Sequence, residues 1–394
     1  MKLIDFCIRE IGIPFAMDFK HALAARTQTS AVIFEITTDT GIHGYGEGTP
    51  REYVTGESVG STVKALKAAA EKLIGWQINP THDAVKQIEG LTSALFDKET
   101  YAPSAKCALE LALIDTLGKA SKKSAARLLG PLKTSSICFS GIVSDESLDA
   151  TKEILTLIKA FGFNQIKIKV GNDTDADARK LDLARSVLGD TAQIRIDANA
   201  IWRLPEAVTK INRYDHDFNV HIVEQPLAAE RREDYPKLME QIAPDTKIIL
   251  DESICTLDDA RWFIDNQAAT GFNLKISKHG GLIDTLKIYH LACAHGFDCQ
   301  LGCHVGETAI LTTAGHIFAG LADALIAYEG SYGKYLLTHD IVNDPPQFDS
   351  KGHFRMDNLN ASPGFGLSIN PALVHKATIR RINIPPQYDR RSGR

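Results

Sequence analysis

The sequence shows no membrane-spanning run, no secretion signal and no long tract of one charge sign. No apolar run approaches the roughly 20 residues that a transmembrane helix needs. The opening MKLIDFCIRE places Asp5, Arg9 and Glu10 where a signal peptide requires an apolar core. A net charge of -5 over 394 residues offers no basic field for nucleic acid or anionic lipid, apart from the short terminal RRSGR. We therefore expect a cytoplasmic protein whose partners are small molecules, with no nucleic acid and no membrane among them.

The cysteines lack the spacing of a structural site. There are seven, an odd number, and no two of them stand as CxxC. A disulfide framework is built from an even set, and a structural zinc site needs closely spaced pairs. We interpret them as small buried apolar residues: Cys7, Cys107, Cys138, Cys255, Cys293, Cys299 and Cys303.

The composition of the sequence and the spacing of its apolar residues change along the chain. Up to about Gly48, short β-like runs alternate, and TDTG marks a turn between two of them, which predicts a meander of strands. Residues 61–129 are rich in Ala, Leu and Lys at helical spacing, as in SAKCALELALIDTLGKA. We expect residues 1–130 to form an α+β domain. We expect residues 340–394, which end in ATIRRINIPP before the tail, to rejoin and complete it.

Residues 131–339 carry a repeat instead. Short runs rich in Ile, Val and Leu recur with helical segments between them, which is the pattern of βαβ units and a parallel sheet. All eight runs have a buried character and none has that of an edge strand, so a closed (β/α) barrel fits better than an open sheet. The runs are ICFSGIV, QIKIKV, QIRIDA, VHIVEQP, KIILDES, GFNLKIS, FDCQLGC and ALIAYEG.

Ionisable residues stand at the ends of five of these runs. Lys169, Asp197, Glu224, Asp251 and Lys275 follow one another at intervals of 24 to 28 residues, about one βα repeat each. The carboxyl ends of barrel strands meet on one rim, so these five side chains should converge there. A single strand-end Asp often only caps the next helix. Three acids in phase with two lysines favour a site.

The three acids indicate a metal. Converging carboxylates raise one another's pKa unless a cation lies among them. Oxygen ligands without His or Cys favour Mg2+ over zinc or copper. Magnesium leaves positions for a substrate carboxylate and can hold the charge that develops when the α-proton leaves. The sequence therefore predicts a Mg2+ enzyme that acts on a small carboxylate substrate through an enediolate intermediate.

The stretch QIKIKVG puts two lysines on one face of a buried strand. Lys167 and Lys169 are two residues apart, so their side chains point the same way. Only a neutral lysine can accept a proton, and a second ammonium nearby, together with burial, lowers a lysine pKa toward the working pH. We expect Lys167 to tune Lys169 in this way. The alternative is that both lysines pair with acidic neighbours.

Five motifs, in this order and one barrel strand apart, resemble those of the enolase superfamily and its muconate-lactonizing-enzyme subgroup: KIKVG, RIDANA, VEQP, LDES and NLKISKHGG. The resemblance covers nearly the whole chain. It implies a fold of class α/β, a (β/α)7β TIM-like barrel with an α+β capping domain, and Mg2+ as cofactor. The mandelate-racemase subgroup fits less well, because it uses a KxH or KxR pair and a His–Asp dyad where this chain has Lys275.

The resemblance also implies roles for the five strand-end residues. Asp197, Glu224 and Asp251 match the family's metal ligands. Lys169 and Lys275 match its two acid/base residues, which lie on opposite faces of the substrate.

Three further residues match supporting positions of the family. Asn199 in DAN and Glu252 in DES would orient the metal ligands, or could simply cap helices. Glu307 in GCHVGET resembles the glutamate that lies against the substrate carboxylate. Its alternative role is that of a carboxylate at a helix N-terminus.

Substrate contacts are less clearly marked. Dipeptide epimerases of the subgroup carry DxD at the eighth strand, whereas this chain has AYEG, with Ala327 in place of the first carboxylate. Glu329 could hold an amine or a substituted proline nitrogen, or it could pair with Lys334. His304 stands where the subgroup often has Met, which suggests a more polar pocket or a structural histidine. Candidates from the capping-domain loops, by position alone, are Lys20, His21, Arg51 and Tyr53.

Two lysines on opposite faces can exchange one α-proton, so we expect a racemase or epimerase of an amino-acid derivative. A muconate-type cycloisomerase or a dehydratase or lyase would use the same five residues. A non-catalytic binding scaffold is a third alternative, because a fold alone does not establish function. The resemblance implies a homo-oligomer, although no feature of the sequence sets the number of subunits.

Overall fold

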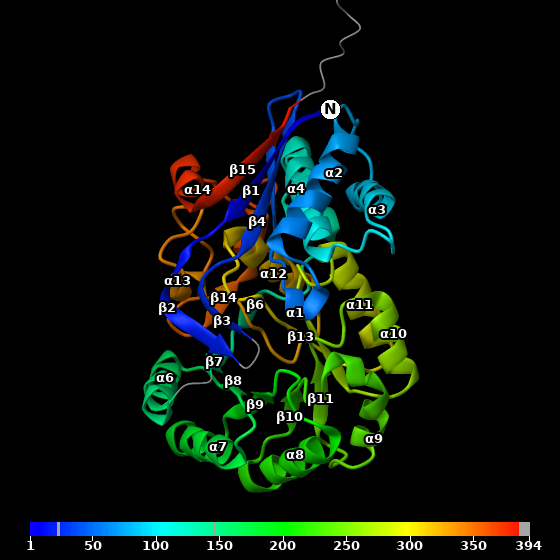
Figure 1. Cartoon of the computed structure of the whole chain (residues 1–394). Helices are drawn as coiled ribbons and strands as arrows, with labels where there is room; N and C mark the ends of the chain where they lie inside the picture. Colours follow the sequence, from blue (N-terminus) through cyan, green and yellow to red (C-terminus); the bar gives the residue numbers. More distant parts are fainter. Residues whose placement is uncertain (22–23, 145–146, 386–394) are drawn as a thin grey trace, which may run out of the picture.

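A computed structural model describes residues 1–21, 24–144 and 147–385, and of residues 17–21 and 24–26 it describes the backbone alone. Figure 1 shows an antiparallel sheet with helices at one end of the molecule and a ring of parallel strands surrounded by helices at the other. Within the described residues, no helix is both long and apolar enough to cross a membrane.

The antiparallel sheet joins the two ends of the described chain. Its strand order is β15-β1-β4-β5, formed by β15 (Thr378–Ile384), β1 (Leu3–Ile11), β4 (Ala31–Thr38) and β5 (His43–Gly48). The TDTG turn connects β4 to β5, and Gly41 has φ 77°, a left-handed conformation that glycine adopts without a Cβ clash. Figure 1 shows β15 (red) beside β1 (blue), where the two strands pair antiparallel.

Two helices cover this sheet, α2 (Val59–Leu73) and α4 (Pro103–Ser121), and α3 (Ala84–Leu95) packs against α4. Most of α4 is buried, and it lies directly against β5. The glycines of β5 permit this approach, because a Cβ on Gly46 would overlap the backbone oxygen of Ala108. The Gly-rich run GIHGYGEG is therefore a helix-packing surface.

The parallel sheet has seven strands in the order β13-β12-β11-β10-β9-β8-β7, which is also their order along the chain. Neighbouring strands are one βα repeat apart, as the sequence predicts. The strands are β7 (Gly141–Val143), β8 (Gln165–Lys169), β9 (Gln193–Asp197), β10 (Ile222–Glu224), β11 (Lys247–Leu250), β12 (Gly271–Leu274) and β13 (Asp298–Leu301).

Two of the eight expected strands differ from the expectation. The run ICFSGIV divides into β7 and the short β6 (Ser136–Cys138), which pairs antiparallel with β14 (His353–Arg355) outside the barrel. The run ALIAYEG forms only a bridge, but its backbone closes the ring. Leu301 N donates to Ala327 O at 3.0 Å on one side, and Ser140 N donates to Tyr328 O at 2.8 Å on the other.

The remaining helices surround the barrel or connect it to the cap (Figure 1). Those that follow the parallel strands are α6 (Leu148–Phe161), α7 (Thr174–Leu188), α8 (Leu204–Phe218), α9 (Tyr235–Met239), α10 (Leu257–Asp265), α11 (Leu282–Ala294) and α12 (Ala309–Leu321). The shorter elements are α1 (Glu52–Thr55), α5 (Ala125–Leu129), α13 (Gly333–Leu336), α14 (Pro371–Ala377), the 3-10 helices η1 (Ala229–Asp234) and η2 (Met356–Asn360), and the hairpin of β2 (Pro14–His21) and β3 (Ala24–Gln28).

Buried carboxylates of the cap dock onto barrel helices. Glu47 on β5 accepts hydrogen bonds from Thr308 N at 2.9 Å and Leu311 N at 3.0 Å, at the start of α12. Glu110 on α4 accepts from Ile283 N at 3.1 Å, at the start of α11. These contacts satisfy amide groups that a helix leaves without partners in its first turn. They position the cap over the barrel, while the domain limits at residues 130 and 340 stay predictions.

Candidate active site

The five strand-end residues lie on one rim of the barrel. Lys169, Asp197 and Glu224 are the last residues of β8, β9 and β10, and they are direct partners in the parallel register. Asp251 and Lys275 come directly after β11 and β12. The structure therefore brings together the residues that the spacing predicts to converge.

The lysines and carboxylates of this rim form close ion pairs. Lys169 Nζ lies 2.5 Å from Asp197 Oδ2, and Lys275 pairs with Asp251 Oδ2. Lys278 Nζ, completely buried, lies 2.7 Å from the other oxygen of Asp251. Burial alone would raise the pKa of Asp251, but the two lysines outweigh it and hold the pKa well below its usual value.

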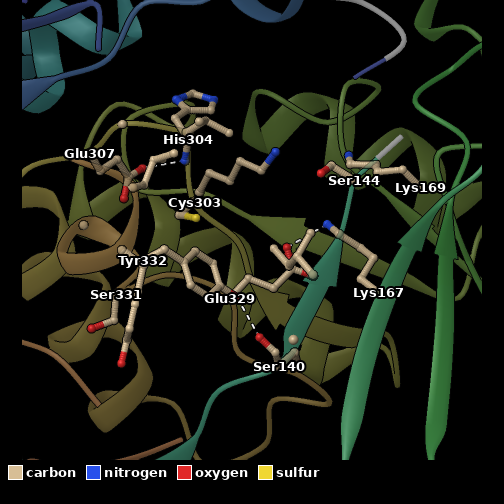
Figure 2. A pocket seen from close by; sticks show the side chains of 18 of the residues that line it. Ser140, Ser144, Lys167, Lys169, Cys303, His304, Glu307, Glu329, Ser331 and Tyr332 are labelled. Carbon is tan, nitrogen blue, oxygen red and sulfur yellow. Dashed lines mark hydrogen bonds and ion pairs between the residues drawn. The ribbon is translucent and has the colours of Figure 1, made fainter. Parts of the chain in front are cut away.

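Lys167, the other lysine on this face of β8, lies among three carboxylates. Its ammonium lies 2.7 Å from Glu329 Oε2, 3.1 Å from Glu224 Oε2 and 3.5 Å from Asp197 Oδ2; Figure 2 shows it directed toward Glu329. Burial opposes the charged form, yet these carboxylates outweigh burial and raise the pKa of Lys167 well above its ordinary value. Lys167 is thus paired with acids, and its tuning of Lys169 stays a prediction.

Glu329 does not pair with Lys334, which is exposed. Instead it pairs with Lys167 and with Arg195, whose Nη2 lies 3.0 Å from Glu329 Oε1. The interpretation of a Glu329–Lys334 pair was wrong because barrel closure turns Glu329 inward, where two buried cations compensate its charge.

The ion pairs continue as a closed ring beneath the rim. Arg195 Nη1 donates to Gln300 Oε1 at 2.7 Å, and Gln300 Nε2 donates to Glu224 Oε2 at 2.7 Å. Glu224 and Glu329 both accept from Lys167. Glu329 also pairs with Arg195, so these contacts form a closed ring of side chains. Sequence reasoning missed Arg195, Gln300 and Lys278. The signal for Arg195 is its position two residues before Asp197, on the same strand face.

Asn199 and Glu252 lie against the same rim. Asn199 Oδ1 accepts from Lys169 at 2.8 Å, and its Nδ2 donates to Glu252 Oε1 at 3.4 Å. Asn199 has φ 44°, a left-handed conformation that Asn adopts more readily than most residues. Burial, and then the charges of Asp251 and Asp197, raise the pKa of Glu252 to about 7.

The donor set fits Mg2+ chemically. The three candidate ligands are carboxylates from consecutive strands. Burial raises the pKa of Glu252, the charges of Asp251 and Asp197 raise it further, and the ammonium of Lys167 lies between Asp197 and Glu224. With their lysine partners in place, no three His, Cys, Asp or Glu side chains of the described residues converge on a common point. A divalent cation would take over the compensation that the lysines now provide.

His304 and Glu307 form part of the wall of a cavity that opens onto this rim. His304 N donates to Glu307 Oε1 at 2.7 Å, and its Nδ1 lies 2.9 Å from Thr49 Oγ1, which the cap contributes. Burial and then the nearby Arg51 lower the pKa of His304 well below its usual value, so its ring is neutral. Burial raises the pKa of Glu307 to about 8. Figure 2 shows both side chains beside Cys303, on the far side of the pocket from Lys167.

The cap candidates separate into different environments. Tyr53 lines the cavity and is partly exposed. Arg51 is buried and donates to Pro50 O and Val305 O, each at 2.7 Å, so it ties the cap to the barrel loop; it is not part of the cavity wall that the described residues form. The side chains of Lys20 and His21 lie outside the described residues.

A cavity of about 380 Å3 opens onto this rim. Lys167, Lys169 and Lys275 all line it, together with Glu307 and Glu329. A volume of this size, with polar groups gathered at one end, is typical of a small-molecule site. The arrangement can bind a carboxylate substrate and move a proton on it, although the role of each residue stays a prediction.

Two family profiles match the chain. The one described as "Mandelate racemase / muconate lactonizing enzyme, N-terminal domain" matches residues 4–130. The one described as "Enolase C-terminal domain-like" matches residues 149–373, more than half of the chain.

Curated relatives share most of their length with the chain. A hydrophobic dipeptide epimerase of Enterococcus faecalis is 30% identical over 320 residues, which cover 81% of this chain and 87% of the relative. An N-succinyl-L-Arg/Lys racemase of Bacillus cereus is 26% identical, over 96% of this chain and 98% of the relative.

Solved structures agree in fold over nearly all of the chain. The N-succinyl Arg/Lys racemase from Bacillus cereus has a TM-score of 0.88 at 26% identity, covering 98% of this chain and 100% of that one. A dipeptide epimerase from Enterococcus faecalis, complexed with Mg and L-Leu-L-Tyr, has a TM-score of 0.84 at 26% identity, covering 93% and 100%.

These relatives are epimerases and racemases, which are isomerases, as predicted for this chain. The barrel with its α+β cap is confirmed as the fold class, and Mg in the Enterococcus complex agrees with the predicted cofactor. The chain therefore belongs to the mandelate racemase and muconate lactonizing enzyme family of the enolase superfamily.

Proposed function

We propose that the protein racemises or epimerises an amino-acid derivative at the carbon α to its carboxylate, with Mg2+ as cofactor. One observation carries the proposal: Lys169 and Lys275 line the same cavity from strands β8 and β12, which are separated by the three strands that bear the carboxylates. Two proton-transfer groups therefore face the cavity from opposite sides of the proposed metal ligands. That placement suits removal of a proton from one face and its return to the other.

The catalytic steps follow from this placement. Asp197, Glu224 and Asp251 would hold the Mg2+, which would neutralise the substrate carboxylate and so stabilise the negative charge of its enediolate. One lysine, in its neutral form, takes the α-proton. The other, protonated, returns a proton to the opposite face of the same carbon, and the stereocentre is inverted. The reverse reaction exchanges the two roles.

Supporting residues hold these groups in place. Asn199 accepts a hydrogen bond from Lys169, and Lys278 fixes one oxygen of Asp251 while Lys275 contacts the other. Because its pKa is raised to about 8, Glu307 is mostly protonated at neutral pH and can donate a hydrogen bond to a substrate oxygen. His304, neutral and with Nε2 free of hydrogen-bond partners, offers a further polar atom to the cavity wall.

The test is α-proton exchange in D2O with Mg2+, followed by mass spectrometry over N-acyl amino acids, dipeptides, proline derivatives and lactone-forming diacids. We expect exchange with inversion for one of these classes. We expect Lys169→Ala and Lys275→Ala to reduce the inversion rate by about 10²- to 10⁴-fold each, the usual contribution of a general acid or base. Products without inversion would instead assign the protein to cycloisomerase or lyase chemistry. Exchange that survives in both variants would contradict the proposed roles of the lysines.

We propose a partner, a cellular location and an assembly for the enzyme as well. A small carboxylate substrate is the proposed partner, in line with the dipeptide bound to the Enterococcus structure. We also keep the cytoplasm as its location and a homo-oligomer as its assembly. Light scattering of the purified chain measures the latter directly.

A further inference from the structure

The cavity continues away from the lysines into a region walled by apolar and aromatic side chains, which we call the apolar arm. One wall is α6, where residues at helical spacing turn the same way, and the other is the segment around α13. The arm is defined by Leu157, Ile158, Phe161, Phe163, Tyr335 and Phe348.

The aromatic rings of the arm pack on one another and so hold its shape. Phe348 stacks on Tyr335 with ring centroids 5.6 Å apart and meets Phe163 edge-on at 5.7 Å. Phe161 meets the other side of the group, with its ring 6.1 Å from that of Tyr335. Offset and edge-on pairs of this kind are the favoured aromatic arrangements. The arm is therefore a preformed surface.

The arm reaches the surface of the protein. Leu157 is 59% exposed and Tyr335 is 42% exposed, and both also line the cavity that contains Lys169 and Lys275. Exposed apolar side chains that continue into an active site mark a binding surface more often than isolated ones do. Their continuity with the catalytic lysines indicates that the occupant is part of the substrate.

The charged side chains of the described cavity wall lie at the other end of the cavity. Within the wall formed by the described residues, the charged side chains all belong to the barrel rim or to the loop that carries Glu307. Glu329, the acid that could have received a substrate amine, is compensated by Lys167 and Arg195. Among the residues that the structure describes, the arm therefore has no group that would stabilise a buried cation on a substrate side chain.

We propose that the apolar arm binds an uncharged aliphatic or aromatic substituent of the carboxylate substrate, carried on its nitrogen or on its side chain. The inference rests on the proposed function for the position of the carboxylate at the lysine end. It distinguishes this chain from a racemase of N-succinyl-Arg or N-succinyl-Lys, whose substrates carry a charged side chain.

The test combines ligand length with one surface substitution. N-acetyl-L-alanine is compared by calorimetry, with Mg2+, with N-hexanoyl-L-alanine, which extends the nitrogen substituent, and with N-acetyl-L-phenylalanine, which extends the side chain. We expect affinity to rise by up to about fourfold per added methylene for the substituent that enters the arm. Leu157→Glu should weaken that ligand at least tenfold and leave N-acetyl-L-alanine unchanged. Leu148→Glu is the matched control, because Leu148 is an exposed leucine of the same helix outside the cavity wall.

Three results would overturn the inference: equal affinity for all three ligands, equal effects of the two leucine variants, or a change of oligomeric state in Leu157→Glu by light scattering, which would make the arm a subunit interface. Failure of the proposed function has a different signature. The extended ligands would then bind more tightly, and Leu157→Glu would weaken them, without α-proton exchange in D2O. That result would support the arm and contradict the racemase.

Discussion

Two groups of carboxylates are buried equally deeply in this protein, but their pKa values are shifted in opposite directions. At the rim described above, which forms the mouth of the barrel, Asp197 and Asp251 are 1% and 2% exposed, and the pKa of each is lowered. Between cap and barrel, Glu47 and Glu110 are 0% and 1% exposed, and burial raises their pKa values to about 7 and about 8. Burial is therefore not what separates the two groups.

The difference lies in the partners. The carboxylates at the mouth face lysine ammonium groups, which carry a full positive charge and outweigh desolvation. The interface carboxylates face the amide groups of α12 and α11, and a helix N-terminus amounts to about half a charge. The mouth thus keeps ionised acids available for a metal, whereas the interface acids dock the cap and remain partly protonated.

The largest expected effect is loss of activity when the charge at the mouth is altered. Chelation by EDTA, or Asp251→Asn, should lower α-proton exchange on the order of 10³-fold, because the metal supplies several kcal/mol of stabilisation to the developing charge. Added Mg2+ should restore the chelated wild type. Asp298→Asn is the matched control, since Asp298 begins β13 at the opposite end of the barrel. Exchange that resists chelation would mean that the mouth needs no metal.

Removing one cation from the mouth should destabilise the fold. Lys278 is completely buried against Asp251, so Lys278→Met leaves a buried carboxylate with one partner fewer and should cost about 3–5 kcal/mol of unfolding free energy. Urea denaturation without Mg2+ measures it. The double variant with Asp251→Asn should recover part of the loss, because the charge that needed Lys278 is gone. Additive losses in this cycle would show that the ion pair has no energetic role.

At the interface the same kind of change should act through pH. The folded-state pKa of Glu47 is about 7, above the ordinary 4.5, so the folded protein binds this proton more tightly than the unfolded chain. Its contribution is complete below about pH 4.5 and is lost as the pH rises through about 7, with a size on the order of 3 kcal/mol.

Glu47→Gln should therefore flatten the fall of unfolding free energy between pH 5 and pH 8, as measured by urea titrations at each pH. Glu71→Gln, on the exposed face of α2, should keep the wild-type slope. If both variants titrate like the wild type, Glu47 is ionised throughout and the interface resembles the mouth.

The smallest effect should come from an ion pair that is not buried at all. Lys98 of the cap lies 2.9 Å from Asp258 on α10 of the barrel, with both side chains mostly exposed. Lys98→Ala should leave the thermal midpoint unchanged within error, in low salt and in 1 M salt alike, because water screens such pairs. A clear, salt-dependent loss of stability would show that surface charge, rather than the buried carboxylates, holds the cap.

Some of the site was predictable because it follows a local rule repeated along the chain. A polar residue at the end of each apolar run, one βα repeat apart, places Asp197, Glu224 and Asp251 on one rim whatever the details of packing. Alternation within QIKIKVG likewise placed Lys167 and Lys169 on one face.

Other features depended on which distant residues meet. The sequence offered Lys334 as a partner for Glu329, five residues away, but closure of the ring between β13 and β7 turns Glu329 toward Lys167 and Arg195. From the sequence, Arg51 was a candidate on a loop of the capping domain. In the structure it is buried and donates a hydrogen bond to Val305 O of the barrel.

The sequence by itself determined the barrel order, the motifs of the rim and the chemistry of its proposed metal ligands, because strand period and repeat length are properties of neighbouring residues. Only the tertiary structure decided which buried acids face a lysine and which face a helix end, and only it created the apolar arm between α6 and the segment around α13. Charge state and cavity shape are set by groups that lie far apart in the chain, since electrostatic and packing energies depend on distance in space.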